Sequence, residues 1–264
     1  MTHAVENKSK IPQIKVEGLT MAYGDKIIQR DLDFTIYKGD IFIIMGGSGC
    51  GKSTLLKHLI GLISPSKGRI LFEDLDFWAA SEEERRNIMK QCGVLYQSGA
   101  LWSSMTLVEN VGLPLKEFTN LPQETIDAIC SLKLRLVGLG GFENYYPSQI
   151  SGGMRKRAAL ARAMALDPKV LFFDEPSAGL DPVSAKHLDD LIVEIRDSLG
   201  ATVVIVTHEL ASIFSIGNNC VFLDNETKTM LATGDPKELL KNTNNPKILE
   251  FLTRGTMKRE VPVV

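Results

Sequence analysis

The sequence predicts an α/β fold with a parallel sheet at its centre, and three apolar segments support this prediction. Residues 41–46 (IFIIMG), 170–176 (VLFFDEP) and 202–209 (TVVIVTHE) have the length and composition of buried strands. Helix-like segments follow the first two strands, at residues 52–62 and 182–200. Alternation of strand and helix along a chain is typical of a parallel α/β core.

Further segments extend this core. Residues 14–24 and 31–40 alternate apolar and polar side chains, which predicts an N-terminal antiparallel β-subdomain. Residues 98–168 lack the strand–helix alternation and are expected to form an inserted, mostly helical subdomain. A late hairpin is expected over residues 219–235, and two short helices with a polar tail over residues 236–264.

These segments suggest a division of the chain into three parts. We expect a flexible N-terminal tail over residues 1–12, one domain over residues 13–240, and a C-terminal helical extension and tail over residues 241–264. The 264 residues are 44% hydrophobic and 23% charged, as in ordinary globular proteins. The formal net charge of −2 argues against nucleic acid as a partner.

The apolar segments and the cysteines indicate the cellular compartment of the protein. The N-terminus lacks the apolar segment of a signal peptide, and no apolar stretch is long enough to cross a bilayer. The four cysteines are scattered without a C-x-x-C pair, at Cys50, Cys92, Cys130 and Cys220. We therefore expect free thiols in a reducing cytosol rather than disulfides or a metal site.

A phosphate loop is predicted at residues 46–54 (GGSGCGKST), which match G-x-x-x-x-G-K-[ST] between an apolar strand and an amphipathic helix. Glycines let the backbone N–H groups of such a loop wrap phosphate oxygens. Lys52 supplies positive charge for the β- and γ-phosphates, and the Ser53 hydroxyl can ligate Mg²⁺. The residues assigned to nucleotide binding here are Gly46, Gly47, Ser48, Gly49, Cys50, Gly51, Lys52, Ser53 and Thr54. Because Cys50 lies inside the loop, we expect bound nucleotide to protect its thiol from alkylation.

Polar residues follow several of the predicted strands, where open α/β sheets bind their ligands. Asp174 ends one strand and is expected to hold the magnesium shell. Glu175 follows directly, and a turn of the chain there would let it act as general base for a water. His208 is expected to contact the γ-phosphate, and Gln97 the metal or the attacking water.

A second anion site is predicted at Ser151, Gly152 and Gly153, which we call the Ser-Gly-Gly turn. It precedes a basic, alanine-rich segment that has the composition of a helix. A helix N-terminus presents free N–H groups and the positive end of the helix dipole. One chain therefore carries two potential phosphate sites.

These motifs, in this order, resemble the ATP-binding subunits of ABC transporters over roughly residues 13–240. The matching motifs are GGSGCGKST (Walker A), Gln97 (Q-loop), ISGGM at 150–154 (signature), FFDEP at 172–176 (Walker B), SAGLD at 177–181 (D-loop) and His208 (switch). The resemblance implies an ABC-type P-loop ATPase with a RecA-like core that uses ATP and Mg²⁺. It also implies that Tyr23 stacks on the adenine and that Asp181 belongs to the nucleotide site.

The resemblance also explains the second anion site. In this family the Ser-Gly-Gly turn of one copy caps the γ-phosphate held by the Walker A loop of the other copy, which implies a homodimer with composite ATP sites. Met154 departs from the glutamine usual in the family, but the backbone donors do not depend on that side chain. A Glu175→Gln variant should then bind ATP, arrest hydrolysis and accumulate as a closed dimer.

Three segments resemble one subfamily, the Mla/Mce lipid-transport ATPases. They are residues 96–115 (with Trp102 in place of the usual Phe), 151–163 and 234–255. This resemblance implies a peripheral subunit on the cytoplasmic face of the inner membrane, with integral-membrane permease subunits and an Mce-domain lipid-binding protein as partners. Its cargo would be phospholipid for outer-membrane lipid homeostasis. The alternatives are an ABC ATPase for another cargo, a soluble ABC ATPase outside transport, or a regulatory binding module.

The sequence leaves the role of three segments open. Leu101, Trp102 and Met105 follow the Q-loop glutamine, and they either line the groove for a permease helix or pack inside the helical subdomain. The basic run at residues 155–157 is expected to be a solvated helix face, with contacts to the dimer partner or to lipid headgroups as alternatives. Residues 244–264 are expected to aid dimerisation.

Overall fold

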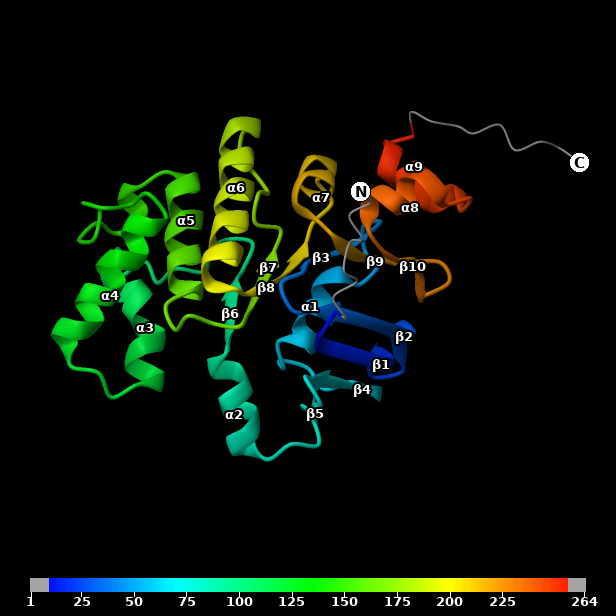
Figure 1. The fold of residues 1–264 in the computed structure, drawn as a ribbon, viewed down its shortest axis with the longest axis horizontal. Helices are drawn as coiled ribbons and strands as arrows, with labels where there is room; N and C mark the ends of the chain where they lie inside the picture. Colours follow the sequence, from blue (N-terminus) through cyan, green and yellow to red (C-terminus); the bar gives the residue numbers. More distant parts are fainter. Residues whose placement is uncertain (1–9, 256–264) are drawn as a thin grey trace, which may run out of the picture.

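The computed structural model describes residues 10–255, and a six-stranded sheet forms its centre (Figure 1). The strands lie in the order β10 (Met230–Gly234), β9 (Asn219–Leu223), β3 (Ile41–Gly46), β8 (Thr202–Val206), β7 (Val170–Asp174) and β6 (Cys92–Leu95). All neighbours are parallel except β10, which runs antiparallel to β9. The predicted parallel α/β core is confirmed, and the late hairpin is β9–β10. Its first strand, β9, is also a core strand paired with β3.

A second, four-stranded antiparallel sheet precedes the core in the chain. Its order is β2 (Lys26–Tyr37), β1 (Pro12–Tyr23), β4 (Lys67–Phe72) and β5 (Leu75–Asp76). The expected N-terminal tail over residues 1–12 extends too far toward the C-terminus. Pro12 already pairs with Tyr37 in the sheet, and the carbonyl of Ile11 accepts from the N–H of Lys38 at 2.9 Å. Residues 1–9 lie outside the described part of the chain.

Helices connect and cover these sheets. They are α1 (Lys52–Leu59), α2 (Glu82–Lys90), α3 (Leu107–Phe118), α4 (Gln123–Leu136), α5 (Gly152–Ala163), α6 (Pro182–Leu199), α7 (Leu210–Ile216), α8 (Pro236–Asn242) and α9 (Pro246–Thr253). Figure 1 shows α3, α4 and α5 together at one end of the molecule, opposite the end that holds β1 and β2. Apart from the end of the N-terminal tail, the domain boundaries expected from the sequence remain predictions.

Local signals set where the longest helix begins and ends. The Asp181 carboxylate accepts from the N–H groups of Val183 and Ser184, both at 3.0 Å, and Pro182 occupies the first helical position. Gly200 ends α6 in the left-handed region with φ 64°. Within residues 10–255, none of the helices is both long and apolar enough to cross a membrane.

The alternation of side chains along β3 divides the core into two clusters. Ile41, Ile43 and Met45 join a cluster that includes buried side chains of α5, α6, α7 and α9. Phe42 and Ile44 point the other way and join α1, β1 and β2. Because successive strand residues face opposite sides, a fully apolar strand fits between two covered faces.

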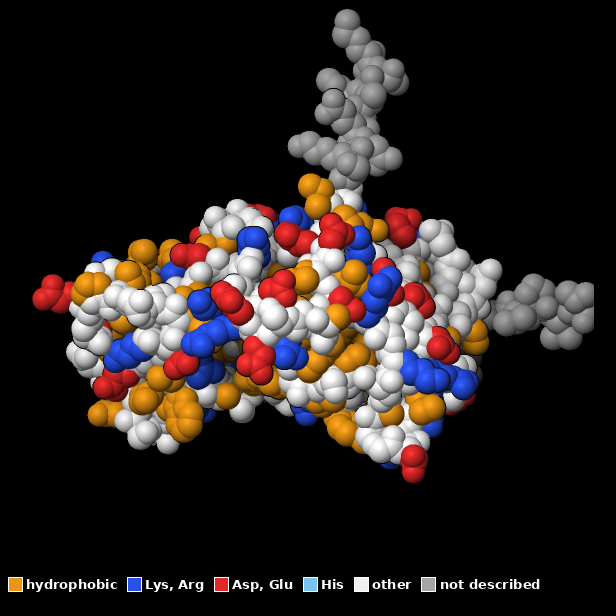
Figure 2. Space-filling model, turned by 90° about the horizontal axis from the view of Figure 1, so that it is seen from below, with side chains coloured by type: hydrophobic (Ala, Val, Ile, Leu, Met, Phe, Trp, Pro, Cys, Tyr) orange, Lys and Arg blue, Asp and Glu red, His pale blue; other side chains and the backbone are white. Residues whose placement is uncertain are grey.

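On the face seen in Figure 2, basic and acidic side chains are interspersed.

The register of the parallel strands aligns their carboxyl ends. Ile44 of β3 and Asp174 of β7 both pair with Val206 of β8. On the next strand, Leu95 of β6 pairs with Phe173. Residues that follow these strands therefore emerge at one edge of the sheet.

The C-terminal helices dock on the same chain. Ile248 and Leu252 of α9 are buried in the larger core cluster, and the Phe251 ring meets Phe222 edge-on with centroids 5.2 Å apart. The Lys247 ammonium donates to the Asp224 carboxylate at 2.9 and 3.0 Å. A role of residues 244–264 in dimerisation remains a prediction, and residues 256–264 lie outside the described part.

Asp224 gives a test of this docking. Burial raises the pKa of its carboxyl, but hydrogen bonds from Thr227 and Lys247 outweigh burial and lower the pKa to about 2. A lowered pKa contributes stability that is present above the ordinary carboxyl pKa and is lost as the pH falls through the folded value. Asp224→Asn should lower the free energy of unfolding by about 2 kcal/mol at pH 7, a typical contribution of hydrogen bonds to a charged group.

Urea unfolding at pH 7 and at pH 2 measures this effect. The difference between wild type and variant should shrink toward zero at the lower pH. Glu226→Gln is the matched control, because this exposed carboxylate also pairs with Lys247 but should add little stability. An equal effect of the two variants would contradict the prediction.

Candidate functional site

The phosphate loop is shaped by glycines that the chain itself requires. Gly46 has φ 144°, and a Cβ there would lie 2.3 Å from the Leu223 carbonyl oxygen. Gly51 has φ 95°, and a Cβ there would lie 2.7 Å from Ile28. Both positions combine a backbone that side chains disfavour with a contact that only hydrogen fits. The loop leads directly into α1, whose N-terminal N–H groups face the same side.

Lys52, Ser53 and Asp174 meet at this loop. The Lys52 ammonium donates to the carbonyls of Gly46 and Gly47, both at 2.9 Å, so its charge lies over the loop. The Ser53 hydroxyl donates to Asp174 at 3.1 Å. Burial raises the pKa of Asp174, and the hydrogen bond from Ser53 partly offsets that. Two of the three predicted metal ligands, Ser53 and Asp174, are thus adjacent.

This oxygen pair fits Mg²⁺. Magnesium is typically bound through one or two protein oxygens together with water and substrate phosphates. Among residues 10–255, no cluster of three or more His, Cys, Asp or Glu side chains is placed to hold a metal. A magnesium ion at Ser53 and Asp174 would therefore need the phosphates of a nucleotide to complete its shell.

Glu175 and His208 form a second pair at the same edge. The chain does turn after β7, because Glu175 has φ 48° and its N–H donates to the Val206 carbonyl at 2.9 Å. One carboxylate oxygen lies 2.8 Å from Nδ1 of His208, and the other is buried and has no hydrogen-bond partner. The unpaired oxygen is a free acceptor among the described residues, as a general base requires, but it is buried, so the site must open for a water to reach it.

Gln97 reaches the same edge but is not brought into contact with the metal-ligand pair. It lies exposed in the turn after β6, and its side chain makes no hydrogen bond to Ser53 or Asp174. The segment that follows is fixed, because Arg162 of α5 donates to the carbonyls of Gly99 at 2.9 Å and Ala100 at 2.7 Å. Trp102, a little further on, is 61% exposed.

Tyr23 ends β1 with half of its side chain exposed. Met21, two residues earlier, reaches within 3.6 Å of where a Cβ of Gly51 would lie. The strand that ends in Tyr23 therefore approaches the phosphate loop through Met21. Stacking on an adenine remains a prediction for this ring.

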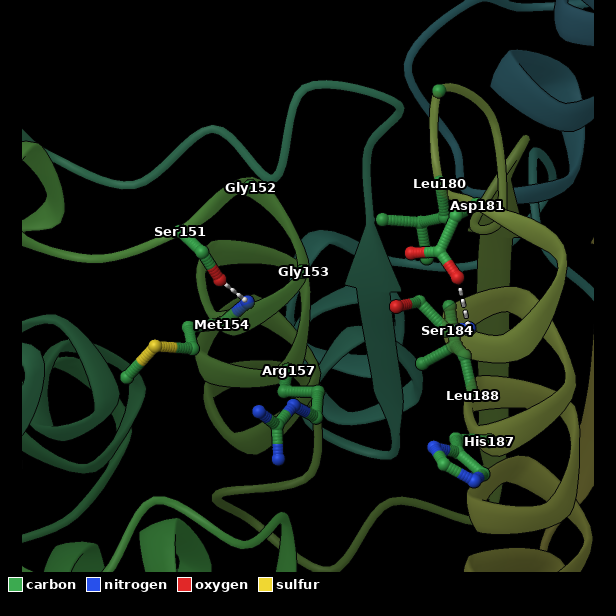
Figure 3. Close-up of a pocket in the computed structure, with 11 residues that line it drawn as sticks. Ser151, Gly152, Gly153, Met154, Arg157, Leu180, Asp181, Ser184, His187 and Leu188 are labelled. Carbon is green, nitrogen blue, oxygen red and sulfur yellow. Dashed lines mark hydrogen bonds between the residues drawn. The ribbon is translucent and has the colours of Figure 1, made fainter.

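The Ser-Gly-Gly turn opens onto a pocket of about 430 Å³ between the N-terminal ends of α5 and α6 (Figure 3). Ser151 caps α5, since its hydroxyl accepts from the N–H of Met154 at 3.2 Å. The N–H groups of Gly152 and Gly153 make no hydrogen bond within the described chain. Met154 packs against the core cluster, so its side chain does not compete for these donors.

The glycines of this turn differ from those of the phosphate loop. Neither Gly152 nor Gly153 has a positive φ, and a Cβ at either would meet nothing closer than 3.7 Å. Glycine weakens a helix by roughly 0.5–1 kcal/mol relative to alanine. Nothing in the described chain requires glycine at these two positions, and the missing side chains leave the backbone N–H groups open to a group from outside the described chain.

Asp181 has a structural role that the sequence analysis missed. Its carboxylate caps α6, and the hydrogen bonds from Ser184 and Val183 lower its pKa. The signal was present in the sequence as Asp-Pro followed by Ser at the third helical position, which is typical of a helix start. Contact of Asp181 with a nucleotide remains a prediction.

The basic run was expected to be solvated, and this is wrong for two of its residues. Lys156 is half-buried and donates to the carbonyls of Pro176 at 2.6 Å and Ala178 at 2.5 Å. Arg157 donates to the carbonyl of Val137 at 3.0 Å. Arg155 is exposed. Both corrected residues satisfy carbonyls of segments distant in sequence, which helical periodicity does not indicate.

Gln29 is another residue that sequence patterns did not single out. Its side-chain amide donates both to the Cys50 carbonyl at 2.7 Å and to the Asp224 carbonyl at 2.8 Å. It thereby joins the phosphate loop to β9 and, through the Asp224 side chain, to α9. β2 and β9 belong to different sheets, so only the packing of the two sheets creates this contact.

The fold and the converging residues define a P-loop nucleotide-binding protein with its site at the carboxyl edge of a parallel sheet. The family model described as ABC transporter matches residues 29–178, and the chain belongs to this family. The resemblance to ABC transporter ATP-binding subunits is therefore confirmed, together with the ABC-type fold.

Three relatives are similar in sequence to most of the chain. It is 42% identical over 239 residues to the "Probable ribonucleotide transport ATP-binding protein mkl" of Mycobacterium tuberculosis, covering 90% of this chain and 66% of that protein, just under two thirds of its length. It is 39% identical to the "Intermembrane phospholipid transport system ATP-binding protein MlaF" of Haemophilus influenzae, covering 90% and 89%. The Escherichia coli MlaF is 38% identical, with 90% and 88% covered. The resemblance to the Mla-type subfamily is thus confirmed.

Two solved structures share the fold. The structure of cbiO1 from Clostridium perfringens, part of the ABC transporter complex cbiONQ, has a TM-score of 0.80 and 29% identity, covering 88% of this chain and 92% of that one. The dimeric structure of MJ0796, a bacterial ABC transporter cassette, has a TM-score of 0.76 and 28% identity, covering 84% and 98%.

The cysteines provide a test of the site. The expectation that nucleotide protects Cys50 loses its basis, because the side chain is only 1% exposed and burial raises the pKa of its thiol. Burial also raises the pKa of Cys130 to about 11 and of Cys220 to about 12. The thiolate is the reactive form of cysteine. We therefore expect the thiols of Cys50, Cys130 and Cys220 to react slowly with an alkylating reagent in the native protein, with or without ATP.

Mass spectrometry after treatment with N-ethylmaleimide at pH 7.5 measures this. Burial raises the pKa of Cys92 to about 12 as well, but its side chain is partly exposed. Cys92 and Cys220 have equally raised pKa values and differ in exposure, so Cys92 should label before Cys220, and this pair is the internal control. Rapid labelling of Cys50 that ATP abolishes would show instead that the thiol is open in solution.

Proposed function

We propose that the chain is the ATP-binding and ATP-hydrolysing subunit of an ABC transporter that moves phospholipid. One observation carries the catalytic part: two pairs, Ser53–Asp174 and Glu175–His208, lie beside the phosphate loop at one edge of the sheet. The first pair suits Mg²⁺ and the second suits activation of a water. Similarity to MlaF over nearly the whole chain supports the cargo.

The chemistry assigns a role to each residue. The phosphate loop and Lys52 hold the phosphates of ATP, and Ser53 and Asp174 would hold Mg²⁺, which supplies neutralisation of phosphate charge. Glu175 takes a proton from the attacking water. His208 holds the Glu175 carboxylate through its 2.8 Å contact and contacts the γ-phosphate, while Gln97 moves in from its exposed turn to contact the metal or water.

The second anion site implies a head-to-tail homodimer. The Ser-Gly-Gly turn of one copy would cap the γ-phosphate on the phosphate loop of the other, with Asp181 close to the same interface. The free N–H groups and the absence of any steric need for glycine within the described chain support this. MJ0796, a cassette of similar fold, has been solved as a dimer.

A Gly153→Ala variant separates the role of this turn in the dimer from its role in folding. The added Cβ would lie 3.8 Å from Leu180, an ordinary contact, and alanine favours a helix. The variant should therefore unfold at the same temperature as wild type or slightly higher. Its ATPase rate should nevertheless fall at least about tenfold, because the methyl group blocks approach of the partner's phosphate. Thermal unfolding and phosphate release measure the two effects, and an unchanged ATPase rate would contradict the proposal.

The cargo assignment places the chain at the cytoplasmic face of the inner membrane as a peripheral subunit. Its partners would be integral-membrane permease subunits and an Mce-domain lipid-binding protein, with phospholipid moved for outer-membrane lipid homeostasis. A second candidate cargo is a ribonucleotide, favoured by the name of the mycobacterial relative. The chain itself need not touch either cargo.

Purification of the tagged chain from membranes in mild detergent distinguishes the two cargoes. Mass spectrometry of co-purified protein and lipid should find a polytopic permease, an Mce-domain protein and enriched phospholipid. A permease with a soluble solute-binding protein and no enriched lipid would overturn the lipid assignment and leave the ATPase assignment intact.

A further inference from the structure

The segment that carries Glu175 is held by a lysine from another element. After β7 the chain forms a loop over residues 175–180, which we call the base loop. The Lys156 ammonium donates to the base-loop carbonyls of Pro176 at 2.6 Å and Ala178 at 2.5 Å, and the Glu175 carbonyl lies at 3.5 Å. An ammonium has three N–H donors, which matches three converging carbonyls.

The base loop needs such support. Glu175 adopts φ 48°, a region that residues other than glycine occupy at a cost unless their surroundings hold them. Within the loop, the N–H of Ala178 returns to the Glu175 carbonyl at 3.2 Å and that of Leu180 to Ser177 at 3.0 Å. Pro176 is buried, so its carbonyl depends on the lysine for a hydrogen bond.

Lys156 also belongs to the helix that begins with the Ser-Gly-Gly turn. It lies one turn after Gly152 on α5, so its backbone moves with that end of the helix. The Ser-Gly-Gly turn faces the ATP of the partner copy, whereas Glu175 serves the ATP bound by its own chain. Lys156 thus connects the Ser-Gly-Gly turn and the base loop within one chain.

We propose that Lys156 is a positioning residue that orients Glu175 of its own chain in response to engagement of the Ser-Gly-Gly turn by the partner's ATP. The proposal rests on the proposed roles of Glu175 and of the turn. It makes hydrolysis at one site depend on closure at the other. Lys156 does not touch the phosphate loop of its own chain, so nucleotide affinity should be independent of it.

The test compares Lys156→Met with Lys156→Arg. Loss of the donors should lower kcat by roughly ten- to a hundredfold, the effect of a small misplacement of a reacting group, with the affinity for a fluorescent ATP analogue unchanged. The Hill coefficient for ATP should fall to about one. Lys156→Arg keeps donors and charge and should restore most of kcat. Lys116→Met, at an exposed position on α3, is the matched control and should behave as wild type.

Mixed dimers show on which site Lys156 acts. When one copy carries Glu175→Gln and the other Lys156→Met, the remaining base lies in the chain without the lysine, and hydrolysis should be slow. When one copy carries both changes and the other is wild type, the remaining base keeps its lysine, and hydrolysis should be about tenfold faster or more. Equal rates, or the reverse order, would overturn the proposal. If Lys156→Met does not fold, Lys156→Gln replaces it in the same design.

The failure of this inference is distinguishable from failure of the proposed function. Undiminished hydrolysis by a Glu175→Gln homodimer would overturn the role of Glu175 and with it the inference. Arrest of that homodimer together with wild-type kinetics of Lys156→Met would overturn the inference alone.

Discussion

The parallel pairing of β3, β8 and β7 is the constraint on which the rest of the site depends. Because Ile44 and Asp174 both pair with Val206, the phosphate loop, Asp174 and the segment that carries His208 leave the sheet at the same level. A shift of one residue in either pairing would turn every side chain of that strand to the other face. Because the strands are apolar on both faces, polarity alone does not select this register, and the close packing of differently shaped side chains in the two core clusters does.

The glycines of the two anion sites differ in whether the fold of the chain itself requires them. At Gly46 and Gly51 the fold leaves no room for a Cβ, so these glycines serve the chain itself. At Gly152 and Gly153 there is room, and the backbone is ordinary helix. Glycine at positions where nothing in the described chain needs it is best explained by a ligand or subunit that approaches the backbone. The proposed second copy would use the backbone that these two glycines leave open.

Side chains that satisfy distant carbonyls hold the site together. Gln29 joins the phosphate loop to β9, Arg162 fixes the segment after the Q-loop, and Lys156 fixes the base loop. Each donor reaches carbonyls that the local backbone leaves free. Since a buried carbonyl without a partner destabilises the fold, these contacts make the loops rigid where catalysis needs defined positions. Two of the three donors, Arg162 and Lys156, lie on α5.

The sequence by itself determined the parallel core, the phosphate loop, the carboxylates at the strand end and the Ser-Gly-Gly turn. Each of these depends on residues only a few positions apart, such as the glycines around Lys52 or the apolar run before Asp174. The tertiary structure alone decided the burial of Cys50, the place of β9 beside β3, the docking of α9 through Asp224 and Lys247, and the partner of Lys156. These contacts join residues far apart in the chain, and their geometry is set by how the sheets and helices pack, which no local pattern encodes.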